Sequence, residues 1–209
     1  MKELKFDIPT LILLILLVLS INKFILNIEQ KQEDIKILKS HVHLLEKHLN
    51  FFVRDIEEYS YILSDSQMVL LKDGVYLLEP SQLHQLVLSD DIQRICDAQI
   101  LGKINDSFSV ISHYIYQNWL VCRSDAYTDI ERLEYIQGYL YYLDSIHYYL
   151  KLQLYLRDGQ LSQKEFKEKL DVKYYSAWMQ QKQEKTFFAE KIDAACKKFE
   201  NKFIEIIER

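Results

Sequence analysis

The sequence predicts an all-α protein in which a single N-terminal transmembrane helix continues into a long heptad-patterned helix, followed by a helical bundle. The first observation behind this class is a shortage of turn residues. The 209-residue chain has four glycines and two prolines, where average usage gives roughly 15 and 10. A β-sandwich or a Gly-rich nucleotide-binding fold requires more of them. The other two observations are an uncharged apolar run near the N-terminus and a seven-residue apolar repeat that follows it.

The apolar run predicts a membrane anchor over residues 8–28, after a short tail at 1–7. Residues 8–21 carry no charge, and apolar residues continue beyond Lys23 to residue 28. A helix of this length covers roughly the 30 Å of a bilayer core, with the Lys23 ammonium extended to the headgroups. A cleaved signal peptide and a buried core helix are the alternatives. The absence of a small-x-small cleavage site after Leu19 argues against the first of them.

The strongest periodic signal lies in residues 29–63, which we expect to form a coiled-coil-like helix. A heptad frame places apolar residues at its a and d positions. The candidate self-association seam consists of Ile35, Leu38, Val42, Leu45, Leu49, Phe52 and Ile56. A second stripe on a neighbouring face contains Ile37, Leu44 and Phe51. Two stripes imply two packing partners, so three interpretations stay open: a dimeric coil, a helix of the chain's own bundle, and a helix that serves both purposes.

Residues 64–209 are expected to form the bundle domain. Residues 69–78 fit either a β-hairpin that turns at an Asp-Gly pair or a helix that ends at Gly74. Pro80 suits the first turn of a helix, and Gly102 is expected to end a later one. From residue 172 to the C-terminus, apolar residues at helical spacing and an excess of basic residues predict an amphipathic helix packed on an acidic body.

The longest helix of the bundle is expected to begin after Thr128, which forms a capping box with Glu131, and to end at Gly159. Several tyrosines of this helix make up a candidate partner face: Tyr135, Tyr141, Tyr142, Tyr148, Tyr149 and Tyr155. Tyrosine is enriched at protein interfaces, which favours a binding role. The alternative is a central bundle helix whose rings are buried and whose hydroxyls reach the rim.

Residues 150–170 form an apolar helix, a glycine turn, and then the pattern Leu-Ser-x-x-Glu-Phe-x-x-Lys from Leu161 to Lys169. Ser162 and Glu165 make a capping box for the second helix. This stretch resembles the short helical hairpin called SHOCT, which is found in many bacterial membrane-associated proteins. The resemblance covers about a tenth of the chain, and it implies an oligomerisation or interaction role and no catalysis.

No motif predicts a catalytic residue, a cofactor site or a metal site. The chain lacks a Walker A loop, a G-x-G-x-x-G, a G-x-S-x-G, an H-E-x-x-H and a Cys-x-x-Cys. His41, His43 and His48 do not have the i, i+4 spacing of zinc ligands on one helix. The three cysteines are too few and too scattered for a disulfide framework. A net charge of -5 gives no reason to expect nucleic acid as a partner.

These patterns predict a membrane-anchored helical scaffold or assembly subunit that acts through protein-protein interaction in a bacterial inner (plasma) membrane complex. Its expected partners are the lipid bilayer, through residues 8–28, and other proteins of the complex, as a homo- or hetero-oligomer. The alternative is a membrane-tethered sensor or effector module, such as a phage-defence or immunity component, and an unrecognised enzyme is less favoured. Basic residues flank the anchor on both sides, and the short basic tail favours an exported (periplasmic) domain over a cytoplasmic one by a narrow margin.

Overall fold

The structure is a computed structural model that describes residues 8–62, 70–170 and 187–208. The predicted tail, the first residue of the 69–78 segment and the start of the predicted C-terminal helix lie outside these ranges. The described residues form helices and no strand: α1 (Ile8–Ile62), α2 (Leu70–Gly74), α3 (Pro80–Val87), α4 (Asp90–Ile95), α5 (Ala98–Val110), the π-helix η1 (Ile111–Ile115), α6 (Tyr116–Cys122), α7 (Asp129–Asp158), α8 (Gln163–Leu170) and α10 (Phe187–Ile207). The predicted all-α class, with a long apolar N-terminal helix and a helical bundle, is confirmed.

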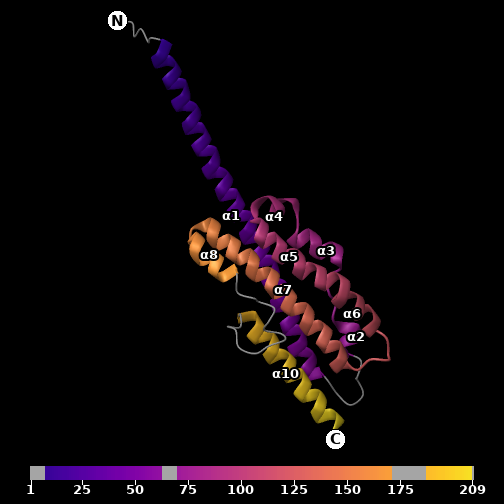
Figure 1. Cartoon of the computed structure of the whole chain (residues 1–209). Coiled ribbons are helices and arrows are strands. Elements are labelled where there is room, and N and C mark those ends of the chain that lie inside the picture. The colour runs from indigo at the N-terminus through magenta and orange to yellow at the C-terminus, as the bar shows by residue number, and fades with distance from the viewer. Residues whose placement is uncertain (1–7, 63–69, 171–186, 209) are drawn as a thin grey trace.

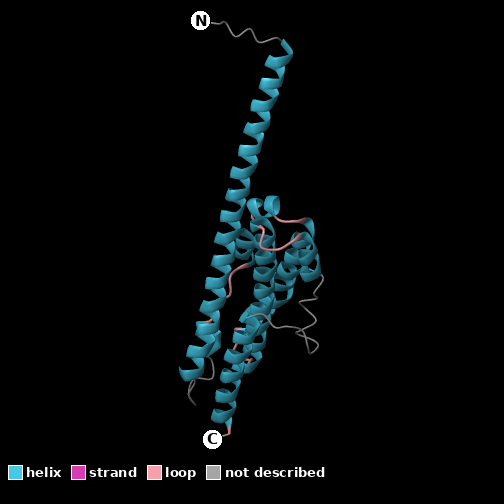
Figure 2. Cartoon of the chain, turned by 90° about the vertical axis from the view of Figure 1, so that its left-hand side faces the viewer, coloured by secondary structure: helices cyan, strands magenta, loops and turns pink. Residues whose placement is uncertain are grey.

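Helix α1 is a single rod that has two different environments along its length. Its 55 residues span roughly 80 Å. The N-terminal part projects beyond the bundle (Figures 1 and 2), and every large apolar side chain from Leu11 to Ile28 is exposed. Burial begins at Asp34, where α1 enters the bundle. Within the part of the chain that the structure describes, α1 is the one helix long and apolar enough to cross a membrane.

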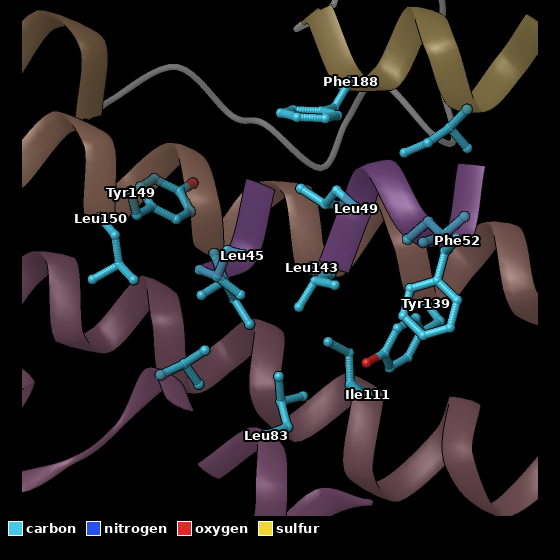
Figure 3. Close-up of a cluster of buried hydrophobic side chains, with 14 of the residues drawn as sticks. Leu45, Leu49, Phe52, Leu83, Ile111, Tyr139, Leu143, Tyr149, Leu150 and Phe188 are labelled. Atoms are coloured by element: carbon cyan, nitrogen blue, oxygen red, sulfur yellow. The ribbon is translucent and has the colours of Figure 1, made fainter. Parts of the chain in front are cut away.

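Helix α7 occupies the centre of the bundle. It contacts α1, α2, α5, η1, α6, α8 and α10, and it runs antiparallel to α1 (Figure 1). Its buried residues meet those of α1, α3, η1 and α10 in one continuous core, which Figure 3 shows around Leu45, Leu143 and Phe188. The rings of Phe52 and Tyr139 pack edge to face with their centroids 5.7 Å apart. A helix covered on most sides explains why apolar residues occur around most of its circumference.

The ends of α7 form as the sequence predicts. The Thr128 hydroxyl accepts a hydrogen bond from the backbone N–H of Glu131, and the Glu131 carboxylate accepts one from the N–H of Thr128. At the other end Gly159 adopts a left-handed conformation with φ 78°. Ser162 and Glu165 repeat the reciprocal pattern before α8. The capping boxes and the glycine stop are therefore confirmed, and Gly159 together with the Ser162 and Glu165 box defines the turn between α7 and α8.

The hairpin considered for residues 69–78 is wrong in the part that is described. Leu70–Gly74 is a helical turn, and residues 75–79 form no strand. A type I′ turn requires a positive φ, and Gly74 does not have one. The Tyr59 ring of α1 instead lies so close to Gly74 that an added Cβ would overlap it. Glycine at this position therefore leaves room for the end of the Tyr59 side chain, and it makes no hairpin.

The expected helix end at Gly102 is also wrong. Helix α5 begins after Asp97, whose carboxylate caps it by accepting a hydrogen bond from the Gln99 N–H at 2.8 Å. The helix passes through Gly102 and continues into the π-helical turn η1 and then α6. Because Gly102 is exposed and an added Cβ would meet nothing within 4 Å, this glycine interrupts neither the helix nor its packing.

Candidate protein-binding groove

The predicted seam of α1 packs against the chain's own helices. Six of its seven residues are buried: Leu38, Val42, Leu45, Leu49, Phe52 and Ile56. The seventh, Ile35, is partly buried and packs at the edge of the core. The covering helices are mainly α7 and α10. The side chains proposed for self-association thus form part of an intramolecular core. This agrees with the interpretation of this segment as a helix of the chain's own bundle.

The second stripe of α1 is the more exposed of the two. Ile37 is half-buried, whereas Leu44 and Phe51 are 40% and 49% exposed. The Arg54 guanidinium lies 5.6 Å from the centre of the Phe51 ring, and it shields part of that ring from water. This stripe is therefore a short apolar line on the outer surface of α1.

The predicted tyrosine face divides among different neighbours. Tyr149 is buried in the core. The Tyr141 hydroxyl donates a hydrogen bond to the Asp193 carboxylate of α10, and the Tyr148 hydroxyl donates to the Lys169 carbonyl of α8 at 3.3 Å. Tyr155 is half-buried, with the Lys151 ammonium 5.9 Å from its ring centre. Tyr141 thus attaches α7 to α10, Tyr148 attaches it to α8, and Tyr149 belongs to the core. The contact of Tyr155 is with its own helix.

The remaining two, Tyr135 and Tyr142, line a groove of about 520 Å³ between α7 and the continuous α5, η1 and α6 segment. The α7 side also contributes Glu134, Gln137 and Gly138, and the opposite side contributes Val110, Tyr114, Ile115 and Asn118. Tyr114 is 67% exposed. Its apolar floor consists of Val110, Ile115 and Gly138, which are buried or half-buried. A groove of this size is typical of a ligand site, and we refer to it below as the tyrosine groove.

Local sequence explains the shape of the tyrosine groove. Gly138 leaves its floor open, and a Cβ added there would meet only the Ile115 side chain, at 3.6 Å. Residues 107–122 contain no Asp, Glu, Lys or Arg, so one wall is an uncharged helical surface. That wall includes η1, and π-helical turns are frequent at functional sites. The sequence prediction missed Tyr114 and Glu134, although the charge-free run was a signal that could have located the wall.

The electrostatics of the tyrosine groove are simple. Among the described residues that line it, Glu134 is the one ionised side chain. Burial raises the pKa of the Tyr135 phenol, and the neighbouring Cys122 and Glu134 raise it further. Burial also raises the pKa of Tyr142. Both phenols are therefore neutral at physiological pH and can donate hydrogen bonds, and the groove carries a single negative charge.

A second polar cluster joins the core helices. The His147 imidazole lies with Nε2 3.2 Å from Glu46 Oε1 and with Nδ1 3.7 Å from Asp144 Oδ1. The Lys151 ammonium lies 3.6 Å from the same Glu46 oxygen, and the Phe188 ring packs edge to face on the imidazole at 5.3 Å. His147 is buried, so the cluster links α1, α7 and α10 rather than facing a substrate.

The other histidines and the cysteines in the described ranges do not form a metal-binding group. No group of three or more His, Cys, Asp or Glu side chains in those ranges is placed to hold a metal ion. His41 contacts the Leu86 carbonyl through Nδ1 at 2.6 Å, while His43 is exposed. Burial raises the pKa of the Cys96 and Cys196 thiols to about 12, so both are poor nucleophiles at neutral pH.

Comparisons with protein-family models, with curated proteins and with solved structures found no match to this chain. The SHOCT resemblance of residues 150–170 therefore stays a prediction. The helical turn itself is present, with α7, Gly159 and α8 in the expected order, but a capped helical turn is a general device and identifies no family. The site has to be interpreted from its own geometry.

Proposed function

We propose that this protein is a single-pass scaffold or assembly subunit of a bacterial inner membrane complex, with its helical bundle held at the membrane surface by α1. The observation that carries the proposal is the continuity of α1. One helix presents a fully exposed apolar length over Leu11–Ile28 and then becomes a principal core helix of the bundle. Because exposed apolar surface on this scale is costly in water, it requires an apolar environment, and its length suits a bilayer.

Arginine substitution in the full chain tests the membrane anchor. Replacing Leu14 and Leu17 with arginine places two charges in the middle of the proposed span, at about 3 kcal/mol each. We expect the wild type to stay in the membrane pellet after a carbonate wash and the double variant to leave it. The matched control replaces Leu44 and Phe51 with arginine. These two side chains are also exposed but lie beside the bundle, so the control should stay in the pellet.

Two results would overturn the anchor. One is release of the wild type by carbonate. The other is an intact mass below the 25.1 kDa of the whole chain, which would indicate cleavage of a signal peptide.

The exported orientation is tested separately. The three native cysteines are buried, so a new exposed cysteine is needed, and Asn105→Cys on α5 provides it. A membrane-impermeant maleimide should label it in intact cells, and labelling only after lysis would place the bundle in the cytoplasm.

The continuity of α1 also favours the second candidate function, a membrane-tethered sensor or effector. A helix that is both anchor and core would pass a change in bundle packing to the membrane. Two glycines inserted after Glu29 would interrupt this coupling without touching the buried part of α1. If the protein is a scaffold, the variant should assemble with its complex on native gels and keep the function of the wild type in cells. If it is a sensor, the variant should assemble equally well but lose that function.

A further inference from the structure

We infer that the tyrosine groove binds a segment of a partner protein that presents an arginine or lysine flanked by aliphatic side chains. This inference rests on the proposed scaffold function and names the kind of partner that it requires. Three features of the groove carry it: an open apolar floor, walls of tyrosine rings, and a single carboxylate. Each of them selects one part of the partner segment.

The floor selects an aliphatic side chain. Val110 of α5, Ile115 of η1 and Gly138 of α7 provide apolar surface, and Gly138 has no Cβ to fill the space beside Ile115. A leucine or isoleucine inserted there would bury its side chain against Ile115. The walls add Tyr114 from η1 and Tyr135 and Tyr142 from α7. Tyrosine rings combine a large apolar surface with a hydroxyl that can bond a partner's polar groups, as is usual where binding energy is concentrated.

The single charge selects a cation. Glu134 lines the groove together with three tyrosines. A guanidinium or ammonium placed beside its carboxylate would gain an ion pair and could also contact a ring face. The described groove lining offers no basic side chain to neutralise Glu134. The surrounding body is acidic as well, with twelve basic residues against twenty acidic ones over 41–172, so a cationic segment is attracted at a distance.

The position of the groove argues for a protein rather than a lipid headgroup. Gly138 of the groove is next to Tyr139, whose ring contacts the Phe52 ring of α1. The groove therefore lies close to the position of Phe52 along the axis of α1. Phe52 follows Ile28, the last residue of the proposed span, by 24 residues, which is about 36 Å of helix. Figure 1 shows α6 in the half of the bundle that is farther from the α1 projection. The groove is thus beyond the reach of the bilayer that α1 would enter.

The test uses the full chain in nanodiscs of zwitterionic lipid and two fluorescein-labelled helical peptides of 14 residues. In both probes leucines lie one turn on either side of a central residue, which is arginine in one and glutamate in the other. Empty nanodiscs measure binding of the peptides to lipid. We expect the wild type to bind the arginine peptide at least tenfold more tightly than the glutamate peptide, with the preference weakened by salt.

Three variants identify the groove as the site. Glu134→Lys should reverse the preference between the two peptides. Gly138→Leu fills the floor and should weaken both peptides at least tenfold while leaving the helical circular dichroism unchanged. Glu168→Lys makes the same charge change on exposed α8 and should bind like the wild type.

The inference is overturned if the wild type binds neither peptide or both equally, or if the two charge variants behave alike. It is equally overturned if Gly138→Leu folds and binds like the wild type. Because binding is measured on the purified protein, these outcomes do not depend on whether α1 anchors the chain in cells. Failure of the groove and failure of the membrane anchor are therefore distinguishable.

Discussion

Arg94 of α4 donates a hydrogen bond to Asp34 of α1, with Nη1 2.8 Å from Oδ1, at the point where α1 enters the bundle. Gln30 donates to the same oxygen at 2.8 Å. The Asp34 side chain is 7% exposed, whereas that of Arg94 is 46% exposed. Asp34 lies six residues, or about 9 Å, beyond Ile28. The contact therefore ties α1 to α4 close to the point where α1 begins to project from the bundle.

Replacing Arg94 with methionine should destabilise the bundle by about 1 kcal/mol. A hydrogen bond to a buried charge contributes more than this, but the exposure of Arg94 lets water screen the interaction. The melting temperature, followed by circular dichroism, should fall by roughly 2–4 °C. Lys36→Met is the control, since its pair with Glu33 is highly exposed and 3.9 Å long. Equal melting temperatures for the two variants would contradict the role given to Arg94.

The same contact predicts a pH dependence. Burial acts to raise the pKa of Asp34, but the hydrogen bonds from Arg94 and Gln30 outweigh it, so the pKa lies below its usual value. A lowered pKa in the folded state stabilises the protein above the unfolded pKa of about 3.9, and this stabilisation is lost as the pH falls through the folded value. The stability difference between the wild type and Asp34→Asn should thus be full at pH 6 and shrink below pH 4. A difference that stays constant across this range would contradict the prediction.

Arg132 should contribute far more than Arg94 because it is completely buried. Its Nη1 lies 2.8 Å from Asp129 Oδ1, and its Nε and Nη2 donate to the Cys122 and Ser124 carbonyls at 2.7 Å each. Removing one partner of a buried ion pair typically costs 3–5 kcal/mol, so we expect Arg132→Met to lose about that much in urea unfolding.

Arg123→Met is the matched control for Arg132→Met. The Arg123 guanidinium lies 5.5 Å from the centre of the Tyr76 ring and its side chain is partly exposed, so its loss should cost below about 1 kcal/mol. A cost for Arg132→Met as small as that of the control would show that the buried pair does not hold the connection between α6 and α7.

The sequence identified the buried side chains of α1 without identifying what covers them. A heptad repeat requires a neighbouring helix at a fixed spacing, and α7 and α10 of the same chain satisfy that requirement as well as a second copy would. The tyrosines of α7 posed the same problem. Tyr141 and Tyr149 share the periodicity of Tyr135 and Tyr142, yet they meet α10 and the core while the other two line the groove.

Local signals were more informative than periodic ones, although the helix end expected at Gly102 is wrong. Thr128 and Gly159 marked the ends of α7 because capping depends on a few adjacent residues. Gly74 fitted both a hairpin turn and a helix end, and the structure has the helix end, with the Tyr59 ring from a distant part of the chain beside it. The π-helical turn at Ile111–Ile115 was not predicted. It joins α5 to α6, and all three contact α7, a long-range arrangement that a single sequence does not display.

Two glycines that look alike in the sequence should respond in opposite ways to alanine. Gly159 and Gly102 are both exposed, and an added Cβ would meet nothing within 4 Å at either position. Gly159, however, has φ 78°, a conformation that costs an L-residue roughly 1–2 kcal/mol. Gly102 lies inside α5 without a positive φ, where alanine is favoured by about 1 kcal/mol.

Gly159→Ala should therefore lower the melting temperature and Gly102→Ala should raise it, with the double variant close to the wild type because the two sites are independent. The comparison separates backbone conformation from steric fit, since the space around the two glycines is the same. If Gly159→Ala were as stable as the wild type, the left-handed turn would not be what ends α7. If Gly102→Ala were destabilising, α5 would have to break at that glycine.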